Sequence, residues 1–501
     1  MAFSSLSSIL LYMIAGQTKN APPIELGVLV LLLAIFSILG IWLALLVPYF
    51  QGPDEQVHYA TIQYWTEPDE KNWLITNSHT LNQGNNIRTY NFSEEVQETA
   101  QRMQFDEIKW QETNTQSFSA GREGLKENEV KENNWKRYID VYPPNASGTW
   151  SLYYWLGSGI ESFFSDRSIF DRLFFARLLS VGLGALTVLI AFLCARKLGW
   201  PPTLATLFAS LIAFQPMFLA TSAVINIDIL LAFAFSLFFC GAALWITAGP
   251  TIQSVSLTMV AMLIGLFTKG PGVVLIGLLF VLILFSLYRR YGTRCRDFLP
   301  YCLLAGFIVT SLFFIFTPAH ILANFLHLGS NSSFSAPLES ISAYLEKTLT
   351  SGAIVWTAMT YWGSFGWLDT NLPQSIISIL LTTETISLFG LIWFFFDKAP
   401  PRFLPSKHIL FFALISILFL QFAIRFFDWR VFDATGKILS GTPGRYFLPN
   451  IIPHLLLVVS GLGYFVRTRA SFQKLLLLLS ISFFTLTSYA LWFIILPRYY
   501  L

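Results

Sequence analysis

The stretch Leu26–Val47, LGVLVLLLAIFSILGIWLALLV, decides the fold class of this chain. Roughly twenty apolar residues in succession are enough for one helix to cross the ~30 Å hydrocarbon core of a bilayer. No Asp, Glu, Lys or Arg interrupts the run. The stretch therefore predicts a first membrane-spanning helix, which can also target the chain to the membrane.

The composition agrees with a membrane environment. Hydrophobic residues make up 54% of the 501 residues and charged residues only 12%, which is far more apolar than a soluble domain needs. The formal net charge of +3 is too small for a nucleic-acid footprint, so no nucleic-acid partner is expected. None of the four cysteines lies in a long polar segment, so no disulfide framework is implied.

Further apolar segments predict an all-α polytopic membrane protein with about eleven transmembrane helices. The segments at Val255 and Ile409 are short and need flanking residues to cross the bilayer. The expected spans after the first are Leu173–Ala195, Thr203–Ala223, Ile229–Thr247, Val255–Phe267, Val273–Tyr288, Phe298–Phe316, Ile376–Phe396, Ile409–Phe422, Ile451–Val466 and Leu475–Leu496.

These spans divide the chain into six parts. Residues 1–25 are expected to form an interfacial segment, 26–47 the first helix, and 48–172 a large outer loop that carries the catalytic motif. Residues 173–316 then hold helices 2–7, 317–375 a second outer loop, and 376–501 helices 8–11.

Basic residues predict the orientation of these helices. With a cytoplasmic N-terminus, every short basic loop falls on the inner side, as the positive-inside rule requires. The loops concerned carry Arg196 and Lys197, then Arg289 to Arg296, then Lys398 to Lys407, and finally Arg467 to Lys474. We therefore expect a multi-pass protein of the inner or plasma membrane whose active site faces outside.

The first candidate site is Pro53–His58, PDEQVH, just beyond the first span. Proline and acidic residues suit the start of a helix, which gives a purely structural explanation. If the helix begins here, Asp54 and His58 share one face, with Glu55 about 100° round. A carboxylate at this boundary can act as general base towards an acceptor hydroxyl, and the pair could hold a divalent ion such as Mg or Mn.

Two short motifs between later spans are the next candidates. Asn226-Ile227-Asp228 lies at an outer turn, where Asp228 is either functional or simply caps the following helix. Lys269 precedes Gly270-Pro271-Gly272, where the glycines allow a close approach of the backbone. Lys269 either holds a phosphate as a point charge or extends its ammonium group to the interface.

The last candidates are cationic and aromatic. Arg445 in the segment GRYFLP has a planar fork suited to phosphate, and its neighbour Tyr446 either lines a site or belongs to an interfacial aromatic belt. Trp362, which opens WGSFGW, either stacks on a sugar or joins that belt. Arg177 either meets a phosphate or extends to the interface. Glu384, in mid-span, must face protein or water.

All four main motifs fall on one membrane face in this topology. They place carboxylates beside basic groups, which suits a donor sugar on a polyprenyl phosphate whose lipid stays in the bilayer. We therefore expect Asp54, Asp228, Lys269 and Arg445 to line one cavity that opens outwards.

The motifs also carry a resemblance. PDEQVH, YPPNASGTWSLYYWL, the QP…NID turn, TKGPG, WGSFGW and GRYFLP together resemble the bacterial family of predicted polytopic membrane proteins of unknown function allied to type C (GT-C) glycosyltransferases. The resemblance runs from about Leu26 to Val466. The first outer loop is also similar to that of protein O-mannosyltransferases and lipid A aminoarabinose transferases, although Asn145–Thr149 is inserted after Pro144.

The resemblance implies a GT-C helical scaffold with the catalytic aspartate in the first outer loop. It places Asp54 at the position of the base, with Glu55 beside it, and implies inverting transfer from a lipid-phosphate sugar to a glycan, lipid or protein acceptor. Two other functions stay open on the residues alone: a transporter or flippase of lipid-linked saccharides, and a non-catalytic subunit of an envelope-glycan assembly machine.

Overall fold

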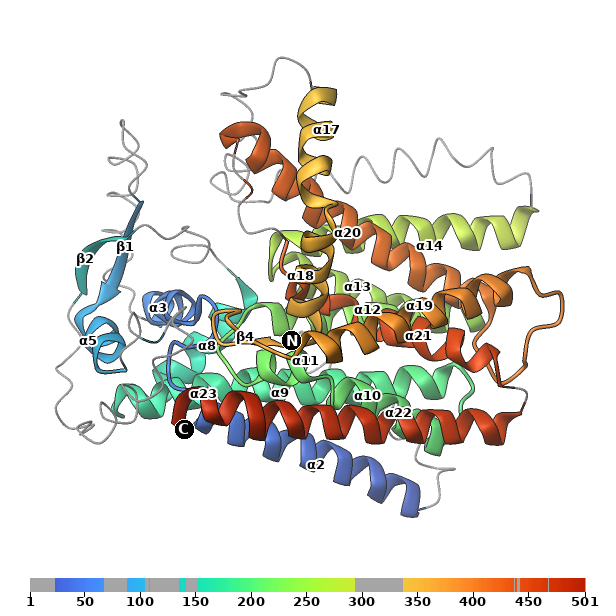
Figure 1. Ribbon diagram of the computed structural model, residues 1–501, viewed down its shortest axis with the longest axis horizontal. Helices are drawn as coiled ribbons and strands as arrows, with labels where there is room; N and C mark the ends of the chain where they lie inside the picture. The colour runs from blue at the N-terminus through green and yellow to red at the C-terminus, as the bar shows by residue number, and fades with distance from the viewer. Residues whose placement is uncertain are drawn as a thin grey trace.

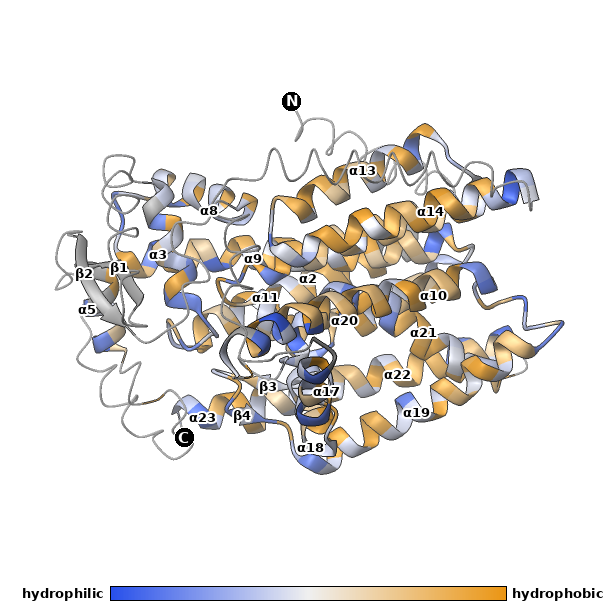
Figure 2. Cartoon of the chain, turned by 90° about the horizontal axis from the view of Figure 1, so that it is seen from above, coloured by the Kyte–Doolittle hydropathy of each residue, from blue (hydrophilic) through white to orange (hydrophobic). Residues whose placement is uncertain are grey.

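The protein is described by a computed structural model that covers residues 23–66, 88–103, 108, 135–140, 151–292, 337–436, 438, 442–466 and 468–500. It is a bundle of long helices that run roughly parallel (Figure 1). Hydrophobic residues predominate along the length of the bundle, and hydrophilic residues gather mainly towards its two ends (Figure 2). This distribution is that of a polytopic membrane protein.

The first half of the chain supplies three long helices, α2, α9 and α12, and a small polar subdomain of α3, β1, α5 and β2 at one end of the bundle (Figure 1). The elements are α2 (Pro23–Leu46), α3 (Glu55–Thr66), β1 (Arg88–Ser93), α5 (Glu94–Arg102), β2 (Trp135–Asp140), α8 (Leu152–Phe163), α9 (Ile169–Lys197), α10 (Pro202–Ala213), α11 (Pro216–Ser222) and α12 (Asp228–Ala248). β1 and β2 pair antiparallel, with Arg88 opposite Asp140.

The second half completes the bundle and returns to the same end. Its elements are α13 (Ile252–Leu266), the 3-10 turn η3 (Gly270–Val273), α14 (Val274–Tyr291), α17 (Pro337–Thr348), α18 (Ser351–Trp362), β3 (Ser364–Phe365), β4 (Thr370–Asn371), α19 (Gln374–Phe396), α20 (Lys407–Thr435), the 3-10 segment η5 (Gly444–Asn450), α21 (Ile451–Tyr464), α22 (Arg469–Tyr489), the π-helical η6 (Ala490–Ile495) and α23 (Leu496–Tyr500).

The core sits around α12. In its most apolar window 94% of the residues are buried, against 22% for α19 and 28% for α14. A helix that is apolar all round belongs in the centre, whereas peripheral helices turn their apolar side chains towards lipid. Of the site elements, η5 packs on this central helix α12 and η3 packs on α13, which itself contacts α12.

The described residues contain eight helices that are long and apolar enough to span a membrane, and a ninth span if α10 and α11 count as one. With the shorter α13, these helices coincide with the predicted spans except Phe298–Phe316, which lies outside the described residues. The predicted number of about eleven is therefore not confirmed, whereas the all-α membrane fold is. The predicted N-terminal interfacial segment also lies outside the described residues, apart from its last three.

The predicted span Thr203–Ala223 is not straight. α10 and α11 meet at an angle of 69°. Pro216 cannot donate a backbone hydrogen bond and excludes the α conformation before it, and the Gln215 side chain accepts from Phe218 N instead. Gln215 Nε2 also donates to Tyr361 O at 2.7 Å, which fastens the bend to α18.

Candidate functional site

Asp54 does not belong to the helix that the sequence predicted from Pro53. α3 begins at Glu55, and Asp54 stands before it with a left-handed φ of 61°. Only the Asp54 carbonyl joins the helix, where it accepts from His58 N at 3.0 Å. The Asp54 side chain is 40% exposed, and its Oδ2 lies 3.1 Å from Arg445 Nη2.

Arg445 is a buried cation with unused donors. It projects from η5, and its side chain is only 6% exposed. Its Nη2 donates to Asp54, but Nε and Nη1 have no hydrogen-bond partner among the described residues. A buried charged donor without a partner is costly, so this guanidinium is poised for an anion.

Asp228 and Lys269 form a second ion pair. Lys269 Nζ lies 2.7 Å from Asp228 Oδ1, with side-chain exposures of 33% and 6%. Asp228 is the first residue of α12, and its own N–H donates to Asn226 Oδ1 at 2.8 Å, so Asn226 caps the turn. Burial lowers the pKa of Lys269, but the Asp228 carboxylate and Tyr446 outweigh it, and the pKa is raised overall.

Tyr446 lies between the two pairs. The Lys269 ammonium is 4.8 Å from the centre of its ring and the Arg445 guanidinium carbon is 5.3 Å away. Cations at these distances are attracted by the ring quadrupole. The aromatic ring therefore holds two cations near each other, and each cation already has a carboxylate partner.

His58 lies beside all four charges. It is buried, and its Nδ1 is 2.7 Å from Tyr154 Oη. Burial lowers the pKa of His58 to about 4, and the charges that act on it belong to Asp54, Lys269, Asp228 and Arg445. His58 is thus neutral at pH 7, and Tyr154 is a member of the cluster that the sequence reading missed although it quoted the LYYWL segment.

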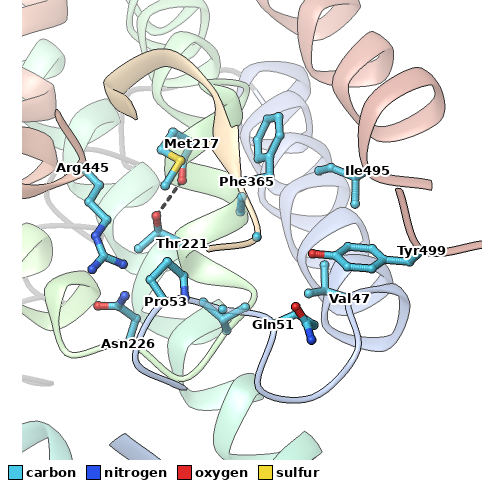
Figure 3. Close-up of a pocket in the computed structure, with 14 residues that line it drawn as sticks. Val47, Gln51, Pro53, Met217, Thr221, Asn226, Phe365, Arg445, Ile495 and Tyr499 are labelled. Atoms are coloured by element: carbon cyan, nitrogen blue, oxygen red, sulfur yellow. Dashed lines mark hydrogen bonds between the residues drawn. The ribbon is translucent and has the colours of Figure 1, made fainter. Parts of the chain in front are cut away.

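A pocket of about 430 Å³, the open solvent at its mouth included, adjoins this cluster (Figure 3). Most of its wall is apolar, and Arg445, Asn226 and Gln51 are among its polar lining residues. Gln51 is buried and its Nε2 has no partner within the described part of the chain, another residue that the sequence reading missed. Of the four charged residues expected to line one cavity, the structure clusters all four but places only Arg445 in this wall.

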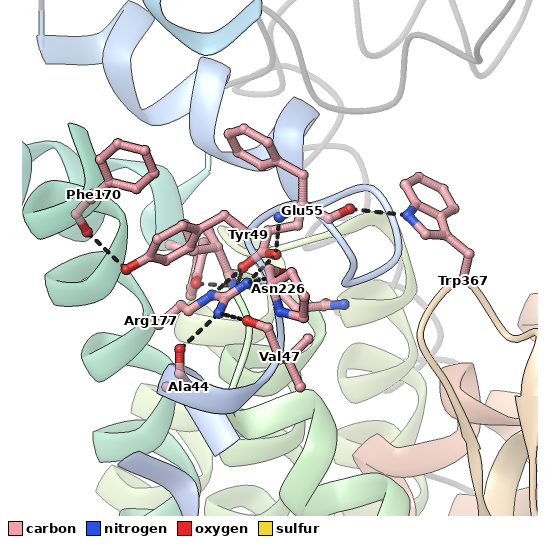
Figure 4. A network of polar contacts seen from close by, with 12 residues as sticks. Ala44, Val47, Tyr49, Glu55, Phe170, Arg177, Asn226 and Trp367 are labelled. Carbon is pink, nitrogen blue, oxygen red and sulfur yellow. Dashed lines mark hydrogen bonds and ion pairs between the residues drawn. The ribbon is translucent and has the colours of Figure 1, made fainter. Parts of the chain in front are cut away.

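Arg177 and Glu55 are committed to each other. Arg177 Nε and Nη2 each lie 2.7 Å from a Glu55 carboxylate oxygen, and both side chains are fully buried (Figure 4). The remaining Arg177 donors reach the carbonyls of Ala44, Val47 and Pro48. Arg177 therefore has no N–H left for a phosphate, and Glu55 has no free oxygen lone pair for chemistry, so both expectations need correction.

Trp362 lies apart from the charged cluster. Its ring packs 5.6 Å from that of Phe483 and 6.0 Å from that of His454, and it lines a separate, apolar cavity of about 320 Å³ with Glu384. Glu384 Oε1 lies 3.1 Å from His454 Nε2, and His454 Nδ1 lies 2.8 Å from Tyr361 Oη. The structure does not bring Trp362 to the same cavity as Arg445.

A divalent ion was one expectation for the acidic motif. Over the described ranges, no three His, Cys, Asp or Glu side chains gather closely enough to hold a metal ion. Asp54 and Asp228 face cations instead. The donor set of this cluster therefore fits an anion with acceptor oxygens better than it fits Mg or Mn.

The sequence was then compared with known proteins. Residues 36–455 match the family described as "Predicted membrane protein (DUF2142)". The chain belongs to this family. Membership confirms the resemblance to a family of predicted polytopic membrane proteins, and the matched range includes the four charged residues of the cluster. No curated protein matches the sequence.

Some solved structures are similar at low identity. ArnT from Cupriavidus metallidurans bound to undecaprenyl phosphate is 18% identical over 66% of this chain and 52% of its own, with a TM-score of 0.35. The oligosaccharyltransferase AglB from Archaeoglobus fulgidus, in complex with an inhibitory peptide and a dolichol-phosphate, is 14% identical over 95% of this chain and 56% of its own, with a TM-score of 0.41. The chain spans about half the length of each.

Proposed function

We propose that this protein is a membrane glycosyltransferase that moves a sugar, with inversion, from a polyprenyl-phosphate donor to an acceptor at the outer membrane face. The observation that carries the proposal is Arg445: a buried guanidinium with two unpartnered nitrogens, in the wall of a mainly apolar cavity, paired with a half-exposed Asp54. A phosphate attached directly to a hydrocarbon chain satisfies both the cation and the apolar wall.

In this mechanism Asp54 takes the proton from the acceptor hydroxyl. The hydroxyl oxygen attacks the anomeric carbon from the face opposite the phosphate, and the bond from that carbon to the phosphate oxygen breaks with its electron pair on the oxygen. Arg445 and Lys269, which flank Tyr446, stabilise the charge on the departing lipid phosphate. His58 is neutral and buried, so it serves the site as a hydrogen-bonding neighbour of Tyr154.

The location at the outer face rests on the basic loops and on the shape of the bundle. The loop after α2 lies at the same end of the bundle as α8 and the polar subdomain (Figure 1), and the Asp54–Arg445 pair joins η5 to this loop. α2 crosses the bundle, and its C-terminal end leads into the loop that carries Asp54. If the N-terminus is cytoplasmic, this loop and the charged cluster therefore lie on the outer side.

The test is mass analysis of the glycans of cells with and without the gene. We expect at least one glycan, glycolipid or glycoprotein to lose a sugar when the gene is deleted and to regain it with the wild-type gene but not with Asp54→Asn. A flippase of lipid-linked saccharides would keep its function with Asp54→Asn, and an assembly subunit would also tolerate loss of Arg445. Either result would replace the transferase with that alternative.

A further inference from the structure

The buried pair Arg177–Glu55 uses all of its hydrogen-bonding capacity. The five N–H groups of Arg177 reach the two carboxylate oxygens and three carbonyls, at 2.6 to 3.0 Å. Each Glu55 oxygen accepts a second hydrogen bond, from Phe50 N at 2.9 Å and from Ile225 N at 3.0 Å. Fully satisfied buried networks rigidify the segments that they join.

One of these segments is the turn that carries Asp54. Arg177 binds the carbonyls at the end of α2, and Glu55 binds the amide of Phe50. Phe50 and Asp54 have left-handed φ values of 69° and 61°, which residues other than glycine rarely adopt. Such conformations persist when the surroundings impose them, and Glu55 is the residue next to Asp54.

The other segment is the turn that carries Asp228. Ile225 N donates to Glu55, Asn226 N donates to Tyr153 Oη at 3.1 Å, and Asp228 begins α12 just beyond. A single carboxylate thus contacts the backbone of both turns that present the acidic residues of the cluster. A third contact to this loop comes from Trp367 Nε1, which donates to Phe50 O at 3.0 Å (Figure 4).

We infer that Arg177 and Glu55 are positioning residues, which hold Asp54 in its left-handed conformation beside Arg445 and fix its placement relative to Asp228. The inference rests on the proposed transferase function and assigns neither residue a contact with substrate. Loss of the pair should displace the base while leaving Arg445, which η5 presents, able to bind lipid phosphate.

The chain offers a matched control on the same helix. Arg172, five residues before Arg177 on α9, pairs with Glu161 at 2.5 Å, and both side chains are nearly as buried, at 8% and 3% exposure. Tyr59 Oη also donates to Glu161 at 3.0 Å. Neither residue is among the described residues that line the cavity, and Arg172 Nε also donates to Arg167 O at 3.2 Å. Glu161→Gln therefore breaks a buried ion pair outside the cavity wall.

The experiment compares Glu55→Gln and Glu161→Gln in full-length protein at matched expression. Three quantities are measured: the apparent unfolding midpoint, binding of undecaprenyl phosphate, and the gene-dependent glycan. We expect both variants to lose stability, but only Glu55→Gln to lower the glycan signal, by about 10- to 100-fold, since a misplacement of ~1 Å can cost that much. Binding of undecaprenyl phosphate by Glu55→Gln should stay close to that of wild type, because η5, and not the turn that Glu55 holds, presents Arg445.

Several results would overturn the inference. The first is that Glu55→Gln transfers the sugar at the wild-type rate per folded molecule. The second is that transfer and lipid binding by Glu55→Gln both fall, and fall by the same factor as in Glu161→Gln. If Glu55→Gln does not fold, Arg177→Lys replaces it, since lysine keeps the charge and loses the fork. Wild-type protein with neither lipid binding nor a gene-dependent glycan would instead refute the proposed function, a result recognisable before any variant is made.

Discussion

Asp54 Oδ2 lies 3.1 Å from Arg445 Nη2, although 391 residues separate them in the chain. The contact joins the first loop after α2 to η5, so the two partners of this ion pair come from opposite ends of the sequence. It also puts the proposed base within reach of the proposed phosphate ligand. Proton removal and leaving-group stabilisation can then act on one bound sugar.

Asp54→Asn should abolish transfer and leave folding nearly unchanged. Removal of a general base typically lowers the rate by ~10²- to 10⁴-fold, whereas the amide oxygen of asparagine can still accept the hydrogen bond from Arg445 Nη2, so the fold should lose much less. The measurements are the gene-dependent glycan and the apparent unfolding midpoint of the purified variant. Retained glycan with a lowered midpoint would give Asp54 a purely structural role.

Arg445→Lys should weaken binding of undecaprenyl phosphate although the charge is kept. Lysine cannot reproduce the planar fork, and hydrogen bonds to charged groups are each worth about 1.5–3 kcal/mol, or roughly 10- to 100-fold in affinity. The control is Arg290→Lys, an exposed arginine in the last turn of α14. Equal affinities of Arg445→Lys and wild type in lipid nanodiscs would remove Arg445 from the phosphate site.

His58 should make the protein less stable in mild acid. Its pKa is about 4 in the folded protein against 6.5 when unfolded, so the unfolded state binds more protons between these values. Stability contributed by neutral His58 is therefore present above pH 6.5 and is lost as the pH falls towards 4, by roughly 2 kcal/mol between pH 7 and pH 5.

The measurement for His58 is unfolding in detergent at pH 7 and pH 5, for wild type and His58→Gln. The variant keeps a polar group near Tyr154 and cannot titrate, so its stability should change less with pH. An equal pH dependence of both proteins would show that other groups cause it.

The orientation can be tested with single cysteines. Gly52 is unsuitable because an added Cβ would lie 2.9 Å from Val224, and Gly436 has a left-handed φ of 67°. Three exposed residues suit the substitution to cysteine: Ser165, which follows α8, Thr435, the last residue of α20, and Ser406, which precedes the first residue of α20. In intact cells a membrane-impermeant thiol reagent should label the first two above the background of the native cysteines, and Ser406→Cys only after lysis. The reverse pattern would invert the topology.

The membrane fold could be predicted from hydropathy because a span is a local property of about twenty residues. The break between α10 and α11 was harder, since its cause combines Pro216 with the Gln215 side chain and a contact to α18. The short α13 was recognised as short because the apolar run itself is short. The local hydropathy thus predicted the helices, whereas the angle between α10 and α11 depends on contacts with residues far away in the sequence.

Part of the candidate site could also be predicted, because the type of a residue and its position relative to the spans are local properties of the sequence. Asp54, Asp228, Lys269 and Arg445 were selected by residue type and sidedness, and the structure brings them together. Glu55 and Arg177 have the same chemistry, but they are 122 residues apart, and nothing local reveals that they neutralise each other. The left-handed Asp54 was also unpredictable, because no glycine marks the position.

The pair of Glu384 and His454 has a consequence for biosynthesis. α19 is made before α21, so Glu384 reaches the bilayer without the imidazole that lies 3.1 Å away in the finished protein. A charged side chain at the centre of a helix raises the cost of insertion by roughly 2.5–3.5 kcal/mol, a cost that the other apolar residues of α19 must offset until α21 arrives. When α21 inserts, His454 gives the Glu384 carboxyl group a hydrogen-bonding neighbour. The order of synthesis therefore means that α19 is fully stabilised in the membrane only after α21 has packed against it.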